Sequence, residues 1–186
     1  SSLFSGRVLL AGRSEFRLDT ERELRRALDN KILLLYFASR RCPRCRDFAP
    51  RLRDFCRRLT DEACVERPEQ LGLVYVGSDR SEEEQRRFLR SVSRRWMAVP
   101  YGDSFGRELA ERFSVSELPC AVVLKPSGEI LSGNAVREIR EAGAACFRDW
   151  REAAELLDRN FRLAEDSERS AARSLTEPFR RLKYRV

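Results

Sequence analysis

The amino-acid sequence predicts an α/β fold in which helices flank a central mixed β-sheet. Two uninterrupted apolar runs, Ile32–Phe37 and Leu71–Val76, have the length of strands that are buried on both faces. A proline leads into a third run, Cys120–Leu124, which a turn connects to a short strand at Ile130–Leu131. Helical patterns separate these runs, and this alternation is typical of a sheet covered by helices.

The first part of the chain predicts a strand and a helix ahead of the first buried run. Arg7–Leu10 is a short apolar segment, which we expect to be a strand. Asp19 and Thr20 form a helix N-cap pattern, because Glu21 and Glu23 follow in the first turn. A later helix presents an apolar stripe at helical spacing, made of Phe48, Leu52, Phe55, Cys56 and Leu59.

Helical patterns return in the second part of the chain. We expect helices over residues 81–92, 103–113 and 146–160. Acidic residues fill the first turn of the first of these helices, where they interact favourably with the helix dipole. Trp96–Tyr101 receives no regular structure, and Trp96 is expected to pack the preceding helix onto the core.

Length and composition predict one domain, residues 1–162, and a flexible basic C-terminal tail, residues 163–186. The chain has 186 residues and is 42% hydrophobic, which suffices for one core. No apolar stretch is long enough to span a bilayer, and the N-terminus lacks the pattern of a secretory leader. Six cysteines are too few and too irregularly spaced for a disulfide scaffold. We therefore expect a cytoplasmic protein in a reducing compartment.

The charge pattern and the missing histidines argue against several classes of function. The formal net charge is +7, but acids and arginines share helical stretches such as Glu82–Arg87. We therefore expect solvated helix faces and no nucleic-acid partner. The chain has no histidine, which removes Cys-His and Ser-His nucleophile pairs. With no second Cys-x-x-Cys and no glycine-rich phosphate loop, we expect no metal and no other cofactor.

The motif Cys42-Pro43-Arg44-Cys45 lies between a buried strand and an amphipathic helix. A helix N-terminus stabilises a thiolate, because its unpaired amides and its dipole favour negative charge. Together with Arg44, the neighbouring residues Arg41 and Arg46 are expected to lower the pKa of Cys42 further. A lower pKa stabilises the reduced pair. We therefore predict a reduction potential higher, and so more oxidising, than that of thioredoxin, which is about −270 mV.

Two segments carry a resemblance to the thioredoxin superfamily. Phe37–Pro50 resembles the thioredoxin active site, including the proline partway along its helix, and Val115–Pro119 resembles the cis-proline loop. The resemblance covers about residues 5–160 and implies a thioredoxin fold. The long stretch ahead of that loop is similar to the tryparedoxin and nucleoredoxin branch, with an extra helical insertion before the cis-Pro loop. Cys146–Trp150 and the end of the chain resemble nucleoredoxin-like proteins, known as rod-derived cone viability factors.

The thioredoxin resemblance implies roles for individual residues. Cys42 would attack a protein disulfide and Cys45 would resolve the mixed disulfide. Pro119 would be cis, and the backbone of Leu118 would offer hydrogen bonds to an extended partner. The residues expected to contact the substrate are Arg41, Pro43, Arg44, Leu118 and Pro119.

The family resemblance also implies partners and a setting. Protein disulfides are the expected substrates, and thioredoxin or glutathione would supply the electrons that recycle the site. Nucleoredoxin-like proteins imply a photoreceptor setting, cone survival, protection from oxidative damage and basigin as a cell-surface partner of a shorter form. The oligomeric state stays open.

Two departures from the thioredoxin pattern keep a second interpretation open. Arg41 stands where thioredoxins have a tryptophan, and Tyr36 aligns with their buried carboxylate, although a tyrosine is a poor base near pH 7. The alternative function is a thioredoxin-fold interaction or survival-signalling module with weak or vestigial redox activity.

The remaining cysteines have simpler interpretations. Cys56, Cys120 and Cys146 are expected to be small core residues, because free cysteine is among the most buried residue types. Cys120 would also lie near the active-site pair if the fold carries over. Cys64 falls in an expected loop and is the best candidate for an accessory or regulatory thiol.

Overall fold

The computed structural model describes residues 2–12, 16–28, 30–60, 71–93 and 95–155. Residues 1–150 form one unit, and the second unit, 151–186, is described only at 151–155, which are helical. The predicted domain boundary at 162, the basic tail and Cys64 all lie outside the described residues. Within the described part of the chain, no helix has the length and apolar character needed to cross a bilayer.

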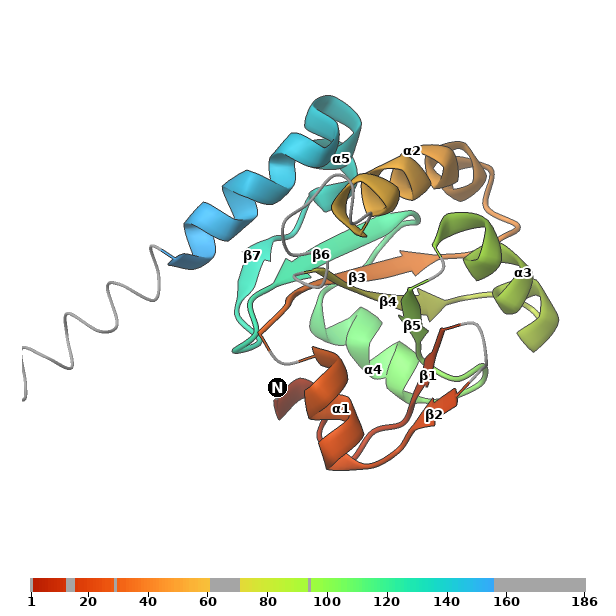
Figure 1. Cartoon of the computed structure of the whole chain (residues 1–186). Coiled ribbons are helices and arrows are strands. Elements are labelled where there is room, and N and C mark those ends of the chain that lie inside the picture. The colour runs from red at the N-terminus through yellow and green to blue at the C-terminus, as the bar shows by residue number, and fades with distance from the viewer. Residues whose placement is uncertain (1, 13–15, 29, 61–70, 94, 156–186) are drawn as a thin grey trace, which may run out of the picture. The chain divides into compact units, whose positions relative to one another are not determined.

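A seven-stranded mixed sheet forms the centre of the first unit, in the order β2-β1-β5-β4-β3-β6-β7 (Figure 1). Its strands are β1 (Leu9–Ala11), β2 (Phe16–Leu18), β3 (Ile32–Ala38), β4 (Leu71–Gly77), β5 (Trp96–Ala98), β6 (Cys120–Leu124) and β7 (Ile130–Ser132). The central strand β3 pairs parallel with β4 and antiparallel with β6. The predicted mixed sheet is therefore confirmed.

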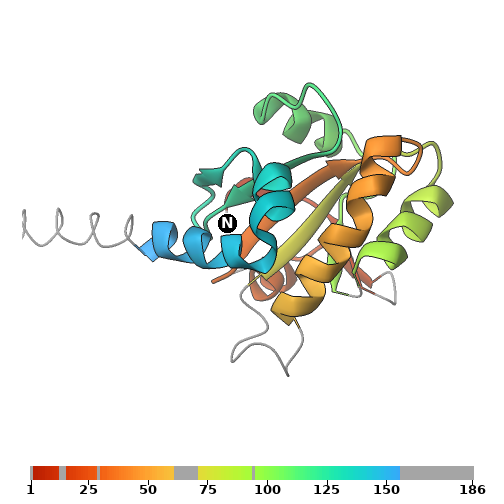
Figure 2. The same cartoon turned by 90° about the horizontal axis from the view of Figure 1, so that it is seen from above.

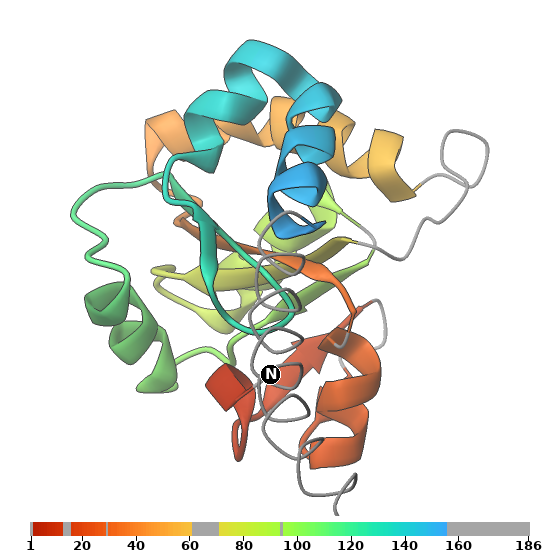
Figure 3. The ribbon, with the colours of Figure 1, turned by 90° about the vertical axis from the view of Figure 1, so that its left-hand side faces the viewer.

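Helices cover both faces of this sheet. They are α1 (Glu21–Leu28), α2 (Pro43–Thr60), α3 (Glu82–Val92), α4 (Phe105–Arg112) and α5 (Ala135–Ala142). Helices α2, α3 and α5 lie on one face, and α1 and α4 lie on the other (Figures 1 and 3). The thioredoxin-like arrangement predicted from the sequence is thus the observed one.

The alternation of side chains along β3 decides what lies beneath the cysteine motif. Every residue of β3 is buried, as expected for a strand covered on both faces. Leu34 and Tyr36 belong to the core cluster under α2 and α3, whereas Leu35 and Phe37 belong to the cluster under α1 and α4. Tyr36 therefore lies on the face that carries the active-site helix.

The insertion before the cis-proline loop contributes a strand as well as a helix. Strand β5 follows α3 and pairs with β4 in parallel and with β1 antiparallel, so it joins the N-terminal strands to the sheet. Trp96 of β5 is buried in one cluster with Phe88 and Leu89 of α3, as the sequence predicted. Strands β2 and β5 and helix α5 were not predicted from the sequence.

Candidate active site at the start of helix α2

Backbone hydrogen bonds place Cys42 directly before the first turn of α2. Its N–H donates to the Ser39 carbonyl at 3.1 Å, and its carbonyl accepts the N–H groups of Cys45 and Arg46, each at 3.1 Å. Pro43 is the first helical residue, a position where the missing N–H of proline costs nothing. Because β3 ends at Ala38, only a short loop separates the buried strand from the reactive residue.

The sulfur of Cys42 faces the loop that carries Pro119. The Leu118–Pro119 peptide is cis, as the resemblance implied. The Cys42 thiol donates a hydrogen bond to the carbonyl oxygen of Leu118, with the sulfur and oxygen 3.6 Å apart. Two segments that are distant in sequence thus meet at the reactive sulfur.

Partial burial raises the pKa of Cys42, but hydrogen bonds to the sulfur outweigh it and the net shift is downward. The Cys45 thiol, the backbone amides of Cys45 and Arg44, and the Arg44 guanidinium all stabilise the thiolate. These are the groups expected at a helix N-terminus. Cys42 is half-buried, so a partner can reach its sulfur.

Cys45 has the opposite character. Its side chain is fully buried in the cluster beneath α2. Burial, together with the neighbouring Cys42, raises the pKa of Cys45 to about 12, although a Ser39 backbone hydrogen bond acts in the other direction. At neutral pH Cys45 is therefore a thiol that donates a hydrogen bond to Cys42.

Tyr36 lies in the aromatic layer of the same cluster. Its ring centroid is 6.0 Å from that of Phe48, 6.0 Å from that of Tyr75 and 6.4 Å from that of Phe88. Its buried hydroxyl has no hydrogen-bond partner among the described residues. Burial first, and then the charges of Cys45 and Cys42, raise the pKa of Tyr36. Tyr36 is therefore not a base for the thiols near pH 7.

Asp79 fastens the loop before Cys42 to the end of β4. One carboxylate oxygen accepts the backbone N–H of Arg40 at 2.7 Å, and the other accepts the Tyr75 hydroxyl at 2.7 Å. The Tyr75 oxygen also lies 3.1 Å from the carbonyl of Ala38. We call Asp79, Tyr75 and the Arg40 amide the loop clasp. It was not predicted from the sequence, since its residues lie up to 39 positions apart.

The three arginines that flank the motif have three different surroundings. Arg44 lies 2.8 Å from Glu117 and is the arginine that acts on the Cys42 thiolate. Arg41 points to α3, where its guanidinium lies 3.3 Å from Glu84. Arg46 lines a groove between α2 and α3. The sequence had predicted that all three lower the pKa of Cys42 together.

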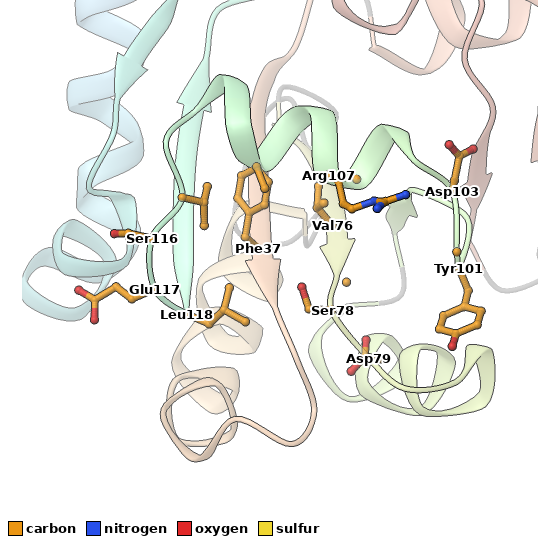
Figure 4. Close-up of a pocket in the computed structure, with 15 residues that line it drawn as sticks. Phe37, Val76, Ser78, Asp79, Tyr101, Asp103, Arg107, Ser116, Glu117 and Leu118 are labelled. Atoms are coloured by element: carbon orange, nitrogen blue, oxygen red, sulfur yellow. The ribbon is translucent and has the colours of Figure 1, made fainter.

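The cis-proline loop separates two hollows beside the motif. On one side, a cleft of about 530 Å³ has the apolar side chains Phe37, Val76 and Leu118 in its wall and Arg107 and Asp79 at its polar edge (Figure 4). On the other side lies a pocket of about 440 Å³. Its charged lining comprises Arg44, Glu117, Arg137, Arg140 and Glu141. An extended chain crossing Leu118 and Pro119 would have room for side chains on both sides.

The other described cysteines lie away from the reactive sulfur or beneath the surface. Cys56 and Cys146 are buried core residues, as predicted. Cys120 is half-buried directly after Pro119 and packs against the cluster under α4. Burial, and then Glu117, raise the pKa of Cys120. Across the described ranges, no three His, Cys, Asp or Glu side chains gather as a metal site would need.

Comparison with known proteins identifies the family. A thioredoxin-like family matches residues 30–130. The chain is 51% identical to nucleoredoxin-like protein 1 of Mus musculus over 100% of its own length and 86% of the mouse protein. It is 50% identical to nucleoredoxin-like protein 1 of Homo sapiens over 100% of its length and 88% of that protein, and 48% identical to that of Danio rerio over 99% and 86%.

Solved structures support the same fold. Thioredoxin from Wuchereria bancrofti superimposes with a TM-score of 0.63 and 26% identity, covering 81% of this chain and 98% of that one. Tryparedoxin from Trypanosoma brucei superimposes with a TM-score of 0.64 and 22% identity, covering 80% and 95%, and this likeness concerns the fold alone. The chain belongs to the nucleoredoxin-like protein 1 family of the thioredoxin-like proteins.

Proposed function

We propose that this protein is a thiol-disulfide oxidoreductase that reduces disulfides of other proteins. The observation that carries the proposal is the contrast between the two thiols of one motif. Cys42 is accessible and has a lowered pKa, whereas Cys45 is buried and its pKa is raised to about 12. An attacking thiol must be a thiolate, and a resolving thiol can stay protonated until the mixed disulfide forms.

The reaction transfers two electrons to the partner. The Cys42 thiolate attacks one sulfur of the partner disulfide, forming a Cys42–partner disulfide and releasing one partner thiolate, which takes up a proton. Cys45 then loses its proton to solvent and attacks the sulfur of Cys42, which releases the second partner thiolate. The partner disulfide is reduced to two thiols, and Cys42 and Cys45 are oxidised to one disulfide.

The oxidised pair needs an external thiol reductant. A dithiol protein such as thioredoxin, or two molecules of glutathione, would return two electrons and leave Cys42 and Cys45 as thiols. A cytoplasmic location fits this requirement, because glutathione and thioredoxin keep thiols reduced there.

The substrate would bind as an extended segment across Leu118 and Pro119, beside the Cys42 sulfur. The backbone of Leu118, next to the cis Pro119, offers hydrogen-bonding groups close to the Cys42 sulfur. Pro43 and Arg44 are exposed at the start of α2, and Arg41 is exposed beside them. We assign substrate contact to Arg41, Pro43, Arg44, Leu118 and Pro119. Arg41 replaces a flat apolar surface with a guanidinium group that Glu84 already pairs at 3.3 Å, so it adds no unpaired charge beside the motif.

The biological setting is proposed from the family. Membership of the nucleoredoxin-like protein 1 family supports a role in photoreceptors, where the protein would limit oxidative damage and sustain cones. Basigin is the membrane partner proposed on the same ground. A test is oxidative challenge of cultured cones that express either the intact chain or the Cys42→Ser variant, with survival as the readout. Equal protection by both chains would separate survival from the redox activity.

A second candidate function is an interaction module with little turnover. The observation in its favour is Tyr36, whose hydroxyl is buried and whose raised pKa prevents it from taking the Cys45 proton. Slow resolution would leave partners attached to Cys42 and favour binding over catalysis.

Single cysteine variants separate the two functions. We expect Cys42→Ser to abolish reduction of an insulin-type protein disulfide, because the attacking thiolate is gone. Cys45→Ser should accumulate mixed disulfides that dithiothreitol releases, and Cys146→Ala serves as a control for loss of an unrelated buried thiol. Failure of Cys45→Ser to trap any partner would rule out the oxidoreductase mechanism, and full biological activity of both variants would favour the interaction module.

A further inference from the structure

A groove rich in arginine runs between α2 and α3, next to the cysteine motif. Figure 2 shows these two helices side by side on one face of the sheet. The groove has a volume of about 310 Å³. Four arginines line it, namely Arg40, Arg46, Arg53 and Arg87. The described residues that line it include no aspartate or glutamate.

The helical repeat puts these arginines around an apolar floor. Arg46, Ala49 and Arg53 stand at positions i, i+3 and i+7 of α2, so they share one face of that helix. Ala49 is 9% exposed and Phe88 of α3 is 4% exposed, so both form the floor rather than the rim. The groove therefore combines a narrow apolar strip with guanidinium groups along its edges.

Most arginines of this face are already paired, but of the four in the groove only Arg87 has an ion pair with a described residue. Arg86 lies 2.7 Å from Glu82, and Arg58 lies 2.9 Å from Asp54. Arg46 and Arg53 have no ion pair with any described residue. The groove thus presents positive charge that the fold itself does not neutralise.

The remaining acids near the groove do not cancel this charge. Glu83 pairs with Arg87 on α3. Glu84 is held by the side chain of Arg41 and by the backbone N–H of Arg80. On the loop side, Asp79 accepts the backbone N–H of Arg40, not its guanidinium. Each acid has its own partner, and the guanidinium groups of Arg46 and Arg53 stay available to a ligand.

We propose that this groove docks an acidic segment of the protein whose disulfide Cys42 attacks. This inference rests on the proposed function and adds the substrate class to it. Guanidinium groups bind carboxylates with paired hydrogen bonds, and the apolar floor accepts an aliphatic side chain between them. Positive charge at the edge of a binding site raises the association rate of negatively charged partners and disfavours positively charged ones.

The position of the groove sets the spacing expected in the partner. Arg53 stands eleven residues after Cys42, which corresponds to about 16 Å along a helix axis. An extended chain covers that distance in about five residues. Acidic residues within about five positions of the target cysteine would therefore reach Arg46 and Arg53.

Two matched disulfide peptides test the proposal with the intact chain. One carries glutamates within five residues of its cysteine and the other carries glutamines at the same positions, while neutral 2-hydroxyethyl disulfide reports on the chemistry alone. We expect kcat/KM to favour the acidic peptide by about three- to tenfold at low salt. The double variant Arg46→Gln/Arg53→Gln should lose that preference and keep its rate with 2-hydroxyethyl disulfide.

The control removes the same charge elsewhere. Arg22→Gln/Arg26→Gln changes two exposed arginines of α1, on the opposite face of the sheet, and should keep the preference. Equal rates with both peptides, or a preference that survives Arg46→Gln/Arg53→Gln, would overturn the proposal.

A direct binding measurement tests the docking of the peptide separately from the reduction of its disulfide. A fluorescent, cysteine-free copy of the acidic peptide should bind the intact chain by anisotropy, and Arg46→Gln/Arg53→Gln should weaken that binding. This holds even if the chain reduces no disulfide, in which case the proposed function fails and the docking site stands. Tighter binding of a DNA oligonucleotide of equal charge would overturn the proposal in favour of a nucleic-acid surface.

Discussion

Cys42 is half-buried at the surface of the site, whereas Cys45, three residues further along the chain, is fully buried in the core. Cys42 directly precedes the first turn of α2 and Cys45 lies within that turn, so both lie at the same positive end of the helix dipole. The pKa of Cys42 is nevertheless lowered, and burial raises the pKa of Cys45 to about 12. Burial therefore outweighs the helix dipole at Cys45, because desolvation of its sulfur raises the pKa by more than the Ser39 backbone hydrogen bond lowers it.

The largest expected effect comes from truncating a large side chain of the core cluster to which Cys45 belongs. Phe48→Ala should lower the free energy of unfolding by about 3–5 kcal/mol, because Phe48 is fully buried and leaves a cavity. Urea denaturation measures the change. Phe16→Ala is the matched control, since Phe16 is 56% exposed and should alter stability by less than about 0.5 kcal/mol. A loss near zero for Phe48→Ala would mean that the core cluster beneath α2 is not packed as described.

The contrast in alkylation rate is the next largest effect. An ordinary thiol pKa of 9.0 and about 12 for Cys45 leave a gap of at least about three units. Ionisation favours Cys42 and the lower nucleophilicity of its thiolate offsets about half of that, so iodoacetamide should label Cys42 at least about 30-fold faster at pH 7. The Cys42 rate should rise with pH and level off below the ordinary thiol pKa. Peptide mass spectrometry resolves the two sites, and equal labelling would remove the distinction between rim and core.

A smaller effect concerns the buried hydroxyl of Tyr36. Tyr36→Phe removes a buried polar group that lacks a described partner, so we expect it to stabilise the fold by about 1 kcal/mol. Tyr75→Phe is the matched comparison and should destabilise by about 1 kcal/mol, because that hydroxyl donates to Asp79. Thermal or urea unfolding gives both values, and the same sign for both variants would contradict the assignment of one free and one bonded hydroxyl.

The smallest effect is the contribution of Arg44 to the rim. Arg44→Gln should raise the pKa of Cys42 and slow its alkylation at pH 7 by about twofold, because the Arg44 side chain is 63% exposed and its charge is screened. Added salt should slow the parent chain toward the variant. Arg51→Gln, further along α2, should leave the rate unchanged, and a larger loss there than at Arg44 would point to a long-range field.

Much of this arrangement follows from local sequence patterns. The apolar run at Ile32–Phe37 predicts a strand buried on both faces, and β3 has that character. The motif after it predicts a thiol at a helix start, because Pro43 favours the first helical position. Both signals are contained within a few consecutive residues, so no knowledge of the tertiary structure is needed.

The elements that were missed have weak local signals. Helix α5 has only eight residues and buries only Ala135 and Ile139, so its periodicity is short. Strand β2 has three residues and exposes Phe16. Strand β5 is equally short and depends on pairing with β4 and β1, which are distant in sequence.

The site residues that were misjudged depend on tertiary contacts. Arg41 finds Glu84 and Arg44 finds Glu117 across 43 and 73 positions, so their directions could not be read from the motif. Arg46 looked like one more positive charge beside Cys42, and the packing of α3 against α2 turns it into the lining of a separate groove. The sequence specifies which charges are present, and only the tertiary fold determines which of them form ion pairs.

The loop clasp has a consequence for how freely the motif can vary. Asp79 holds the main chain at Arg40, and Tyr75 anchors Asp79 from inside the sheet, so the path of the backbone toward Cys42 is set without using any side chain of the motif. Side chains at positions 41, 43 and 44 can therefore be exchanged while the sulfur keeps its place. Other dithiol motifs could therefore be introduced at this position, and their reactivities compared with the backbone around the sulfur unchanged.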